Sequence, residues 1–483
     1  MDLHKHMIQK LAGEVNARKI PLKQIGENVA RRCTAAQERC NAFINFDPRL
    51  LERGINDLAQ KIGQNKKLPL AGVSFVLSDA IVMGETKTTC ASRMLEAYQS
   101  PVDATVAVRL KESGAFPAGK TNMDEFGLGA TGENSLFGAI KNPWDTKYSA
   151  GSGAAAAVSC QAVNLALAPD VCGELRQSAS YCGVPAFKPT YGRVSRKGLV
   201  YGAPSLEQIG IIASHVFDIA AALEIIGGHD AEDPASFKME VPLYTDQLQE
   251  KEASATIRVA VPEDWSEAPG LEDEIKEAFL QALNYLKKNN YHVQMVSLPN
   301  IFYSGVTATI IRAVETFSSL ANYDGVRFGL RAEGSHLQEM YRKTRTEGFD
   351  RKLKQFLTFG ALVSAGNYYN KIFLKAQKMR TLILKELEKC LQEYDLLLTP
   401  AVPFQAPLLD NDKKGFLLPD PAGYYTAAAN LAGLPALSFP LSVESAKNRS
   451  ASVQLLGKAW DEAMLLKTAL FLEKENPVRF PSV

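Results

Sequence analysis

Two short stretches of this 483-residue chain carry side chains that could do chemistry. The first is Gly151-Ser152-Gly153, which precedes an alanine-rich run and has the small residues of a turn that begins a helix. Such a turn can bind a phosphate through backbone N–H groups, but the surrounding residues lack the Gly-x-Gly-x-x-Gly and Walker patterns. We therefore interpret this stretch as a packing turn.

The second stretch runs from Asp170 to Arg176 and offers a thiol and a carboxyl group. Glu174 is interpreted as a carboxylate at a helix N-terminus, where the N–H groups and the dipole stabilise it by roughly 0.3–1 kcal/mol. A general base at this position would need a partner acid or a metal ion, and the sequence offers neither. Cys172 is interpreted as a small buried thiol, because a reactive thiolate needs a nearby cation and Arg176 is the only one in the local sequence.

Strands and helices alternate around these two stretches. Short apolar runs predict strands at 70–77, 115–119, 165–168, 257–261, 291–296, 394–400 and 437–440. Helical periodicity predicts helices in most of 1–65, at 102–112 and 154–158, from Leu175 onward, at 272–289 and in most of 330–395. This alternation predicts an α/β layered fold. A strand, a tight loop and a helix start near residue 170 would direct backbone N–H groups into a cleft.

Composition excludes several classes of protein. The chain has 54 Lys and Arg against 53 Asp and Glu, a net charge of +1, so no strong attraction to nucleic acid is expected. The seven cysteines form no Cys-x-x-Cys pair, and the six histidines show no metal-ligand spacing. We therefore expect no disulfide framework, no metal site and no cofactor, and a reducing compartment.

The location of the protein is also predicted from its apolar residues. The first residues lack the apolar run of a signal peptide, and no stretch of about 18 uninterrupted apolar residues occurs. We expect a cytoplasmic protein that does not associate with a membrane.

A series of longer motifs resembles the amidase-signature family. They include Gly119-Lys-Thr-Asn-Met-Asp-Glu-Phe126, Lys188-Pro-Thr-Tyr-Gly-Arg-Val-Ser-Arg196, Leu374-Lys-Ala-Gln-Lys378 and Asn430-Leu-Ala-Gly-Leu-Pro435. The second and third look like the A-type subunit of the Glu-tRNA(Gln)/Asp-tRNA(Asn) amidotransferases rather than a general amidase. The resemblance covers nearly the whole chain. It implies an α/β fold with one large mixed β-sheet flanked by helices on both faces. It also implies an N-terminal helical segment at 1–65 packed on an amidase-signature domain at 66–483.

The chain departs from the family at the catalytic triad of Lys and two Ser. The resemblance places Ser78, in Gly72-Val-Ser-Phe-Val-Leu-Ser-Asp79, where the family has its basic Lys. It places Glu174 where the family has its nucleophilic Ser, and Ser152 in a loop three residues shorter than the one that carries the bridging Ser. A Ser hydroxyl cannot accept a proton near neutral pH as a buried amine can. No catalytic residue is therefore expected to be intact.

The substrate-binding positions differ as well. The family pattern has an Asp for the glutamine amino group at the position of Gly423, and an Arg for the carboxylate near 354–356, where this chain has Lys-Gln-Phe. The remodelled cleft is expected to be lined by six residues: Asp170, Val171, Cys172, Gly173, Arg176 and Gly423. Loss of the triad and of the clamp together suggests that the glutamine pocket is out of use.

Three hypotheses about function follow. The first, which the sequence favours, is a non-catalytic scaffold, which would serve as an assembly or regulatory component without glutamine amidohydrolase activity. Its partners would resemble the amidotransferase subunits B and C. The second is a small-molecule binding protein that uses the remodelled cleft. The third is a working A-type subunit, or an amidase, with a rearranged active site in which Ser152 or Cys172 is the nucleophile.

Overall fold

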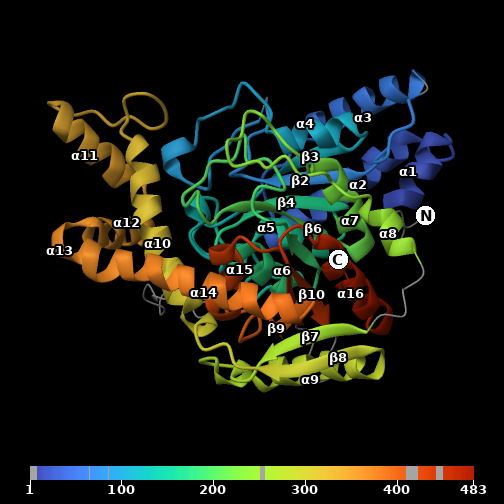
Figure 1. The fold of residues 1–483 in the computed structure, drawn as a ribbon. Helices are drawn as coiled ribbons and strands as arrows, with labels where there is room; N and C mark the ends of the chain where they lie inside the picture. The colour runs from blue at the N-terminus through green and yellow to red at the C-terminus, as the bar shows by residue number, and fades with distance from the viewer. Residues whose placement is uncertain are drawn as a thin grey trace.

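The computed structural model describes residues 8–64, 66–84, 86–250, 256–409, 422–441 and 450–482. Its centre is an 11-stranded mixed sheet with the strand order β1-β3-β2-β4-β6-β5-β10-β11-β9-β7-β8 (Figure 1). The strands are β1 (Phe43–Asn45), β2 (Ser74–Ser78), β3 (Phe116–Thr121), β4 (Leu165–Asp170), β5 (Ala186–Lys188), β6 (Gln208–Ala213), β7 (Ile257–Pro262), β8 (Tyr291–Val296), β9 (Leu396–Pro400), β10 (Ala436–Leu441) and β11 (Ala451–Gly457). The prediction of an α/β fold with one large mixed sheet is confirmed.

The helices surround this sheet. They are α1 (Ile8–Asn16), α2 (Leu22–Cys40), α3 (Pro48–Gly63), α4 (Thr105–Glu112), α5 (Gly153–Ser159), α6 (Glu174–Cys182), α7 (Val216–Ile226), α8 (Tyr244–Gln249), α9 (Asp273–Lys288), α10 (Ser304–Ser319), α11 (Leu337–Gly348), α12 (Arg351–Ser364), α13 (Gly366–Tyr368), α14 (Leu374–Glu393), α15 (Gly423–Ala432) and α16 (Glu462–Glu475). Helices α11 to α13 project from the sheet at the left of Figure 1.

The strands nearest the site lie in the middle of the sheet. Strand β2 pairs in parallel with both β3 and β4, so the carboxyl ends of all three point the same way. Every residue of β2 is buried, which fits a strand covered on both faces. The chain ends of β2 and β4 therefore deliver Ser78 and Asp170 to the same edge of the sheet.

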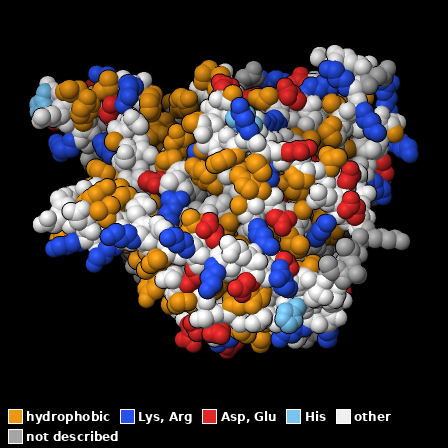
Figure 2. Space-filling model, viewed as in Figure 1, with side chains coloured by type: hydrophobic (Ala, Val, Ile, Leu, Met, Phe, Trp, Pro, Cys, Tyr) orange, Lys and Arg blue, Asp and Glu red, His pale blue; other side chains and the backbone are white. Residues whose placement is uncertain are grey.

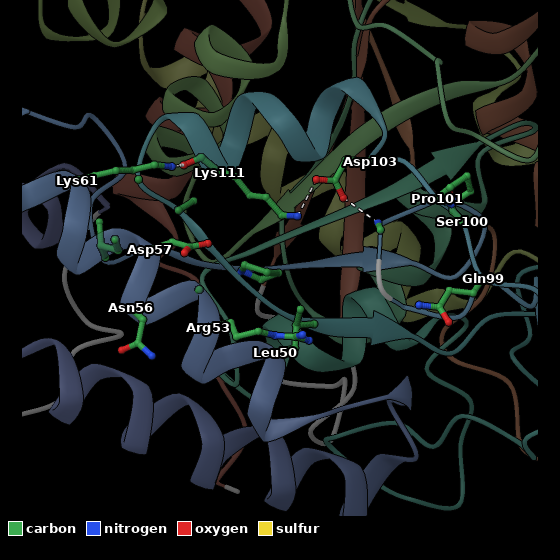
Figure 3. A pocket seen from close by; sticks show the side chains of 16 residues that line it. Leu50, Arg53, Asn56, Asp57, Lys61, Gln99, Ser100, Pro101, Asp103 and Lys111 are labelled. Atoms are coloured by element: carbon green, nitrogen blue, oxygen red, sulfur yellow. Dashed lines mark hydrogen bonds and ion pairs between the residues drawn. The ribbon is translucent and has the colours of Figure 1, made fainter.

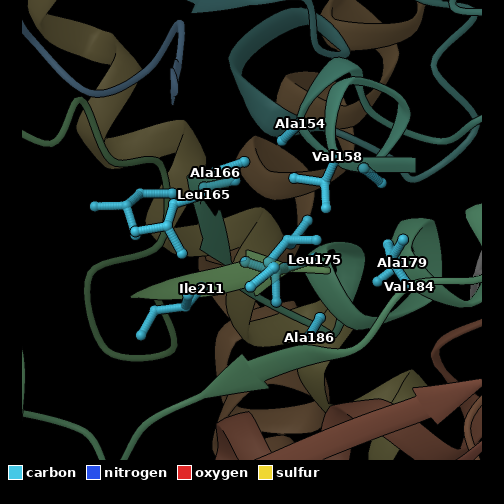
Figure 4. Close-up of a cluster of buried hydrophobic side chains, with 14 of the residues drawn as sticks. Ala154, Val158, Leu165, Ala166, Leu175, Ala179, Val184, Ala186 and Ile211 are labelled. Atoms are coloured by element: carbon cyan, nitrogen blue, oxygen red, sulfur yellow. The ribbon is translucent and has the colours of Figure 1, made fainter. Parts of the chain in front are cut away.

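Small side chains allow α5 to lie close to the sheet. All seven residues of α5 are buried, and a Cβ atom at Gly153 would lie 2.0 Å from the Ala42 carbonyl oxygen. Figure 4 shows Val158 of α5, Leu165 of β4 and Leu175 of α6 among the apolar side chains that fill this layer. Because these helices pack so tightly, their first residues are held in fixed positions above the carboxyl ends of the strands.

Some predicted elements differ from the structure. The helix expected from residue 102 begins at Thr105, because Ala104 is extended with φ −65° and ψ 148°. The range 1–65, expected to be helical, also contains β1, which pairs antiparallel with β3. Strands β5, β6 and β11 were not predicted. They are short or lack flanking turn signals, and their pairing partners lie far away in the sequence.

Candidate functional site

A small cavity of about 40 Å³ lies beyond the carboxyl ends of β2 and β4. Its lining includes Ser78, Ser152 and Glu174, the three positions that the resemblance assigned to the replaced triad. These residues come from β2, from the turn before α5 and from the first turn of α6. The structure therefore brings together the three positions that the sequence singled out. Val171 also lines the cavity.

Ser152 lies in a chain of hydroxyl groups. Its Oγ donates to Ser178 Oγ at 3.0 Å and accepts from the Ala155 backbone N–H at 3.2 Å, which caps α5. Ser178 Oγ in turn donates to the Leu175 carbonyl oxygen at 3.0 Å. A carbonyl oxygen is not a base near neutral pH, so this chain holds Ser152 in place without activating it.

Ser78 is 3% exposed, and its Oγ donates to the Met123 sulfur at 3.3 Å. No lysine occurs among the described residues that line the cavity. Lys120 is buried in the adjacent strand β3, where its Nζ lies 3.2 Å from Asp79 Oδ1 and 3.0 Å from Thr88 Oγ1. The amine is thus engaged with Asp79 rather than with a serine of the cavity.

Glu174 is the most strongly bound side chain of the site. One carboxylate oxygen accepts from the backbone N–H groups of Val171 and Cys172, at 3.0 and 2.8 Å. The other accepts from Arg312 Nη1 at 2.5 Å. The expected position at a helix N-terminus is present, since Glu174 is the first residue of α6. The three donors together make a binding site for one carboxylate, and the side chain of Glu174 occupies it.

Arg312 was missed by the sequence analysis. It lies on α10, 138 residues from Glu174, so no local spacing could indicate the pair. Its guanidinium also donates to the Gly127 carbonyl oxygen and lies 6.0 Å from the Phe356 ring centroid. Burial alone would lower the pKa of Arg312, but the charges of Glu174, Cys172 and Glu207 raise it above its ordinary value. The cation close to Cys172 is therefore Arg312.

Arg176, the cation proposed from the sequence, lies behind the cavity. Its guanidinium binds both carboxylate oxygens of Asp170, at 2.9 and 3.0 Å, and both side chains are fully buried. Burial would raise the pKa of Asp170, but the charge and hydrogen bonds of Arg176 lower it below its ordinary value. This pair, together with Asn430, ties β4 and α6 to α15 and supports the site without lining the cavity.

Cys172, Gly173 and Gly423 lie beside the cavity rather than in its lining. Cys172 is partly exposed and not in a disulfide, and its carbonyl accepts from Thr426 Oγ1 at 2.8 Å. Gly173 has φ +112°, and a Cβ atom there would lie 2.1 Å from Thr426 Oγ1. Gly423 begins α15, 3.8 Å from the Cys172 carbonyl oxygen when a Cβ is added. Small residues at 173 and 423 therefore allow α15 to approach the loop before α6.

Two buried carboxyl groups near the cavity have raised pKa values. Burial raises the pKa of Asp124, which lines the cavity, to about 6, although the N–H groups of Asn134 and Gly132 lower it. Burial also raises the pKa of Glu207 to about 7, opposed by the charge of Arg312 and by two backbone N–H groups. Both groups can exchange a proton near neutral pH, as candidate proton acceptors must.

A larger cavity of about 650 Å³ lies between α3, the start of α4 and β3, and contains none of the predicted site residues. Figure 3 shows that its charged side chains contact neighbours: Lys111 Nζ lies 2.7 Å from Asp103 Oδ2, and Lys61 donates to the Lys111 carbonyl. In the part of the chain that the structure describes, no group of three or more His, Cys, Asp or Glu residues is placed to hold a metal ion. Across the same residues, no helix combines the length and apolarity needed to cross a membrane.

Comparison with known proteins defines the class. The family model described as Amidase matches residues 24–466. The chain belongs to the amidase family. It is 37% identical to the glutamyl-tRNA(Gln) amidotransferase A subunit of Halothermothrix orenii, over 98% of both chains. It is 38% identical to the protein of the same name from Moorella thermoacetica, over 99% of this chain and 98% of the relative.

Solved structures agree with this assignment. The glutamyl-tRNA(Gln) amidotransferase A subunit from Thermotoga maritima aligns with a TM-score of 0.77 and 32% identity, over 96% of this chain and 98% of that chain. A bacterial aryl acylamidase aligns with a TM-score of 0.86 over 99% of this chain and 97% of that chain. Its identity of 20% supports the fold alone.

These relatives correct one expectation. The hypothesis of a non-catalytic scaffold rested on the replaced positions 78 and 174. It is wrong as the main interpretation, because the relatives matched over their full length bear the name of a working part of an amidotransferase, and this chain shares their fold. A few substituted side chains were given more weight than the similarity of the whole chain. The third hypothesis, a working protein with a rearranged site, agrees better with these findings.

Proposed function

We propose that this chain works as the A-type subunit of an amidotransferase that acts on glutamyl-tRNA(Gln), and that it does so with a rearranged active site. The observation that carries the proposal is the collinear similarity to proteins of that name, 36–38% identical over 97–100% of this chain. Such a protein releases ammonia from an amide donor. Subunits resembling B and C are the partners that this function implies.

Cys172 is the candidate nucleophile that the geometry favours. It is partly exposed, lies two residues before the start of α6, and interacts electrostatically with Arg312. A cation and a helix N-terminus both stabilise a thiolate, which needs no separate base to become nucleophilic. Ser152 is the weaker candidate, because its hydroxyl donates to Ser178 in a chain that ends on a carbonyl.

The proposed reaction has two steps. The Cys172 thiolate attacks the amide carbonyl, the C–N bond breaks, and the nitrogen leaves as ammonia after gaining a proton. Water then hydrolyses the thioester to a carboxylic acid and restores the thiol. Asp124 and Glu207 are placed to exchange protons, since the pKa of each is near neutrality. The cavity of about 40 Å³ holds only two or three water molecules, so its lining must open to admit an amide.

Glutamine hydrolysis by the chain assembled with B- and C-type subunits tests the proposal. We expect ammonia release that falls at least about a hundredfold in Cys172→Ala, and a covalent acyl adduct on Cys172 in the mass spectrum. Ser318→Ala, an exposed site on α10, is the matched control and should retain full activity. Loss of activity in Ser152→Ala alone would move the nucleophile to Ser152. Absence of turnover in the assembled complex would refute the function.

A further inference from the structure

The surface of α14 carries an unusual concentration of positive charge. Residues 337–393, from α11 through α14, contain 12 Lys and Arg but only 6 Asp and Glu, whereas the whole chain has 54 and 53. The excess is not visible in the overall composition because it is averaged out over the full length. Figure 2 shows Lys and Arg side chains in a row on the lower left of the molecule, where α14 lies in Figure 1.

The exposed lysines of α14 share one face of the helix. Lys375, Lys378, Lys385 and Lys389 fall at positions i, i+3, i+10 and i+14, and all four are exposed. The opposite face, which includes Ala376, Ile383 and Leu387, is buried. Lys371 extends the row by four residues at the N-terminal end, within the π-helical turn Tyr369–Phe373 (η7). We call these five residues the lysine row.

The lysine row is not neutralised by the surrounding protein. None of its members forms an ion pair with another described residue. Three of the six acidic residues have other roles: Glu339 pairs with Lys343, Asp350 caps α12, and Glu386 accepts from Asn300. The lysine row therefore presents a field of one sign over about three turns of helix.

Exposed aromatic side chains adjoin the row. Tyr368 is 49% exposed and Tyr369 is 40% exposed, immediately before Lys371. The Tyr369 ring packs on Phe373, with 5.3 Å between centroids, which leaves Tyr368 as the more accessible ring. Leu382, 49% exposed, lies within the row itself. Spaced cations beside an accessible aromatic face are typical of a surface that follows a nucleic-acid backbone and stacks on a base.

We infer that the lysine row and Tyr368 form a docking surface for the phosphate backbone of a folded RNA. The inference rests on the proposed function and deepens it, because the relatives' names include a transfer RNA. It departs from the expectation that the chain makes no direct contact with nucleic acid, which was based on net charge alone. Lysines bind phosphates as point charges without reading sequence. The surface therefore positions the RNA on the protein and leaves its discrimination to other contacts.

Equilibrium binding of an unmodified transfer RNA to the full chain tests this inference. The triple variant Lys375→Gln, Lys378→Gln and Lys385→Gln should weaken binding about ten- to a hundredfold at low salt. It should also reduce the slope of log affinity against log salt by about 2 to 3. The matched control is Lys10→Gln, Lys19→Gln and Lys23→Gln, on and between α1 and α2, which changes the net charge equally at exposed lysines. The control should bind like the natural chain.

Tyr368→Ala separates stacking from charge. It should weaken binding about fivefold or more without changing the salt slope, because a ring releases no counterions. Equal weakening in the control triple variant would reduce the effect to net charge and overturn the inference. So would unchanged RNA binding in the α14 triple variant; if that variant also assembled poorly with B- and C-type subunits, the row would belong to an acidic protein partner.

The two proposals fail in different ways. RNA binding is measured without glutamine and without turnover, so an inactive chain that still binds RNA through α14 would refute the proposed function alone. An active complex whose RNA affinity ignores the α14 substitutions would refute the docking surface alone.

Discussion

At the scale of single residues, the site depends on the ion pair between Glu174 and Arg312. The Glu174 carboxylate meets a guanidinium and two backbone N–H groups in a region where both side chains are largely buried. An ion pair of this kind contributes little when compared with an apolar pair, but the loss of one partner leaves a charge without compensation. The stability of the cleft should therefore respond more to single substitutions here than to a double one.

Arg312→Met tests this dependence. We expect a loss of about 3–5 kcal/mol in the free energy of unfolding, because the Glu174 carboxylate stays buried without its cation. The double variant Arg312→Met with Glu174→Gln should recover part of that loss. Denaturant unfolding measures both, and Arg342→Met on the exposed side of α11 serves as the control. Additive losses in the double variant would contradict the coupling.

Glu207 makes the stability depend on pH. Its pKa is raised to about 7, above the 4.5 of the unfolded chain, so the folded state holds the proton more tightly. The penalty is absent below pH 4.5 and grows as the pH rises through 7. Glu207→Gln should remove up to about 3 kcal/mol of the stability lost between pH 5 and pH 8. Thermal unfolding across that range measures the difference, with Glu388→Gln on α14 as a control whose pH profile should match the natural chain.

At the scale of elements, the close approach of α15 to the loop before α6 depends on Gly173. Gly173→Ala adds a Cβ where Thr426 already lies and forces a left-handed φ on alanine. We expect a loss of more than about 3 kcal/mol, since overpacking and backbone strain add. Gly270→Ala is a matched control, because φ is +74° there and no atom lies within 4 Å. It should cost about 1 kcal/mol. Similar losses at both sites, in denaturant unfolding, would show that strain alone acts.

The sequence predicted the elements with local signals and missed those defined by distant partners. The apolar run that ends at Ser78 and the helix that starts at Glu174 were placed within a few residues, because burial and small residues mark them. Strand β11 was missed, although all seven of its residues are buried, because its partners β9 and β10 are set by tertiary pairing. Arg312 was missed for the same reason: a contact across 138 residues leaves no local pattern.

At the scale of the whole molecule, one core joins the two ends of the chain. Ile8 of α1, Phe75 of β2 and Leu472 of α16 belong to the same cluster of buried side chains. The backbone N–H of Ile8 also donates to Asp218 of α7 at 2.9 Å. We propose that the segment 1–65 is packed on the core as part of one folding unit.

Deletion of residues 1–65 tests that proposal. The deletion removes β1 from the edge of the sheet and exposes β3 together with the apolar faces covered by α1 to α3. An uncovered edge strand with an apolar face promotes aggregation, so we expect the shortened chain to elute as large aggregates in size-exclusion chromatography. A monomer with a single cooperative unfolding transition would show that 66–483 folds alone.

The pairing of Glu174 with Arg312 has a consequence for what can enter the cleft. The floor of the cavity already contains one positive and one negative group, so an incoming anion finds no unoccupied counter-ion there. A zwitterionic donor would have to keep its charged end in the water outside. Only an uncharged amide end would pass inward, selected by its width and its hydrogen bonds rather than by its valence.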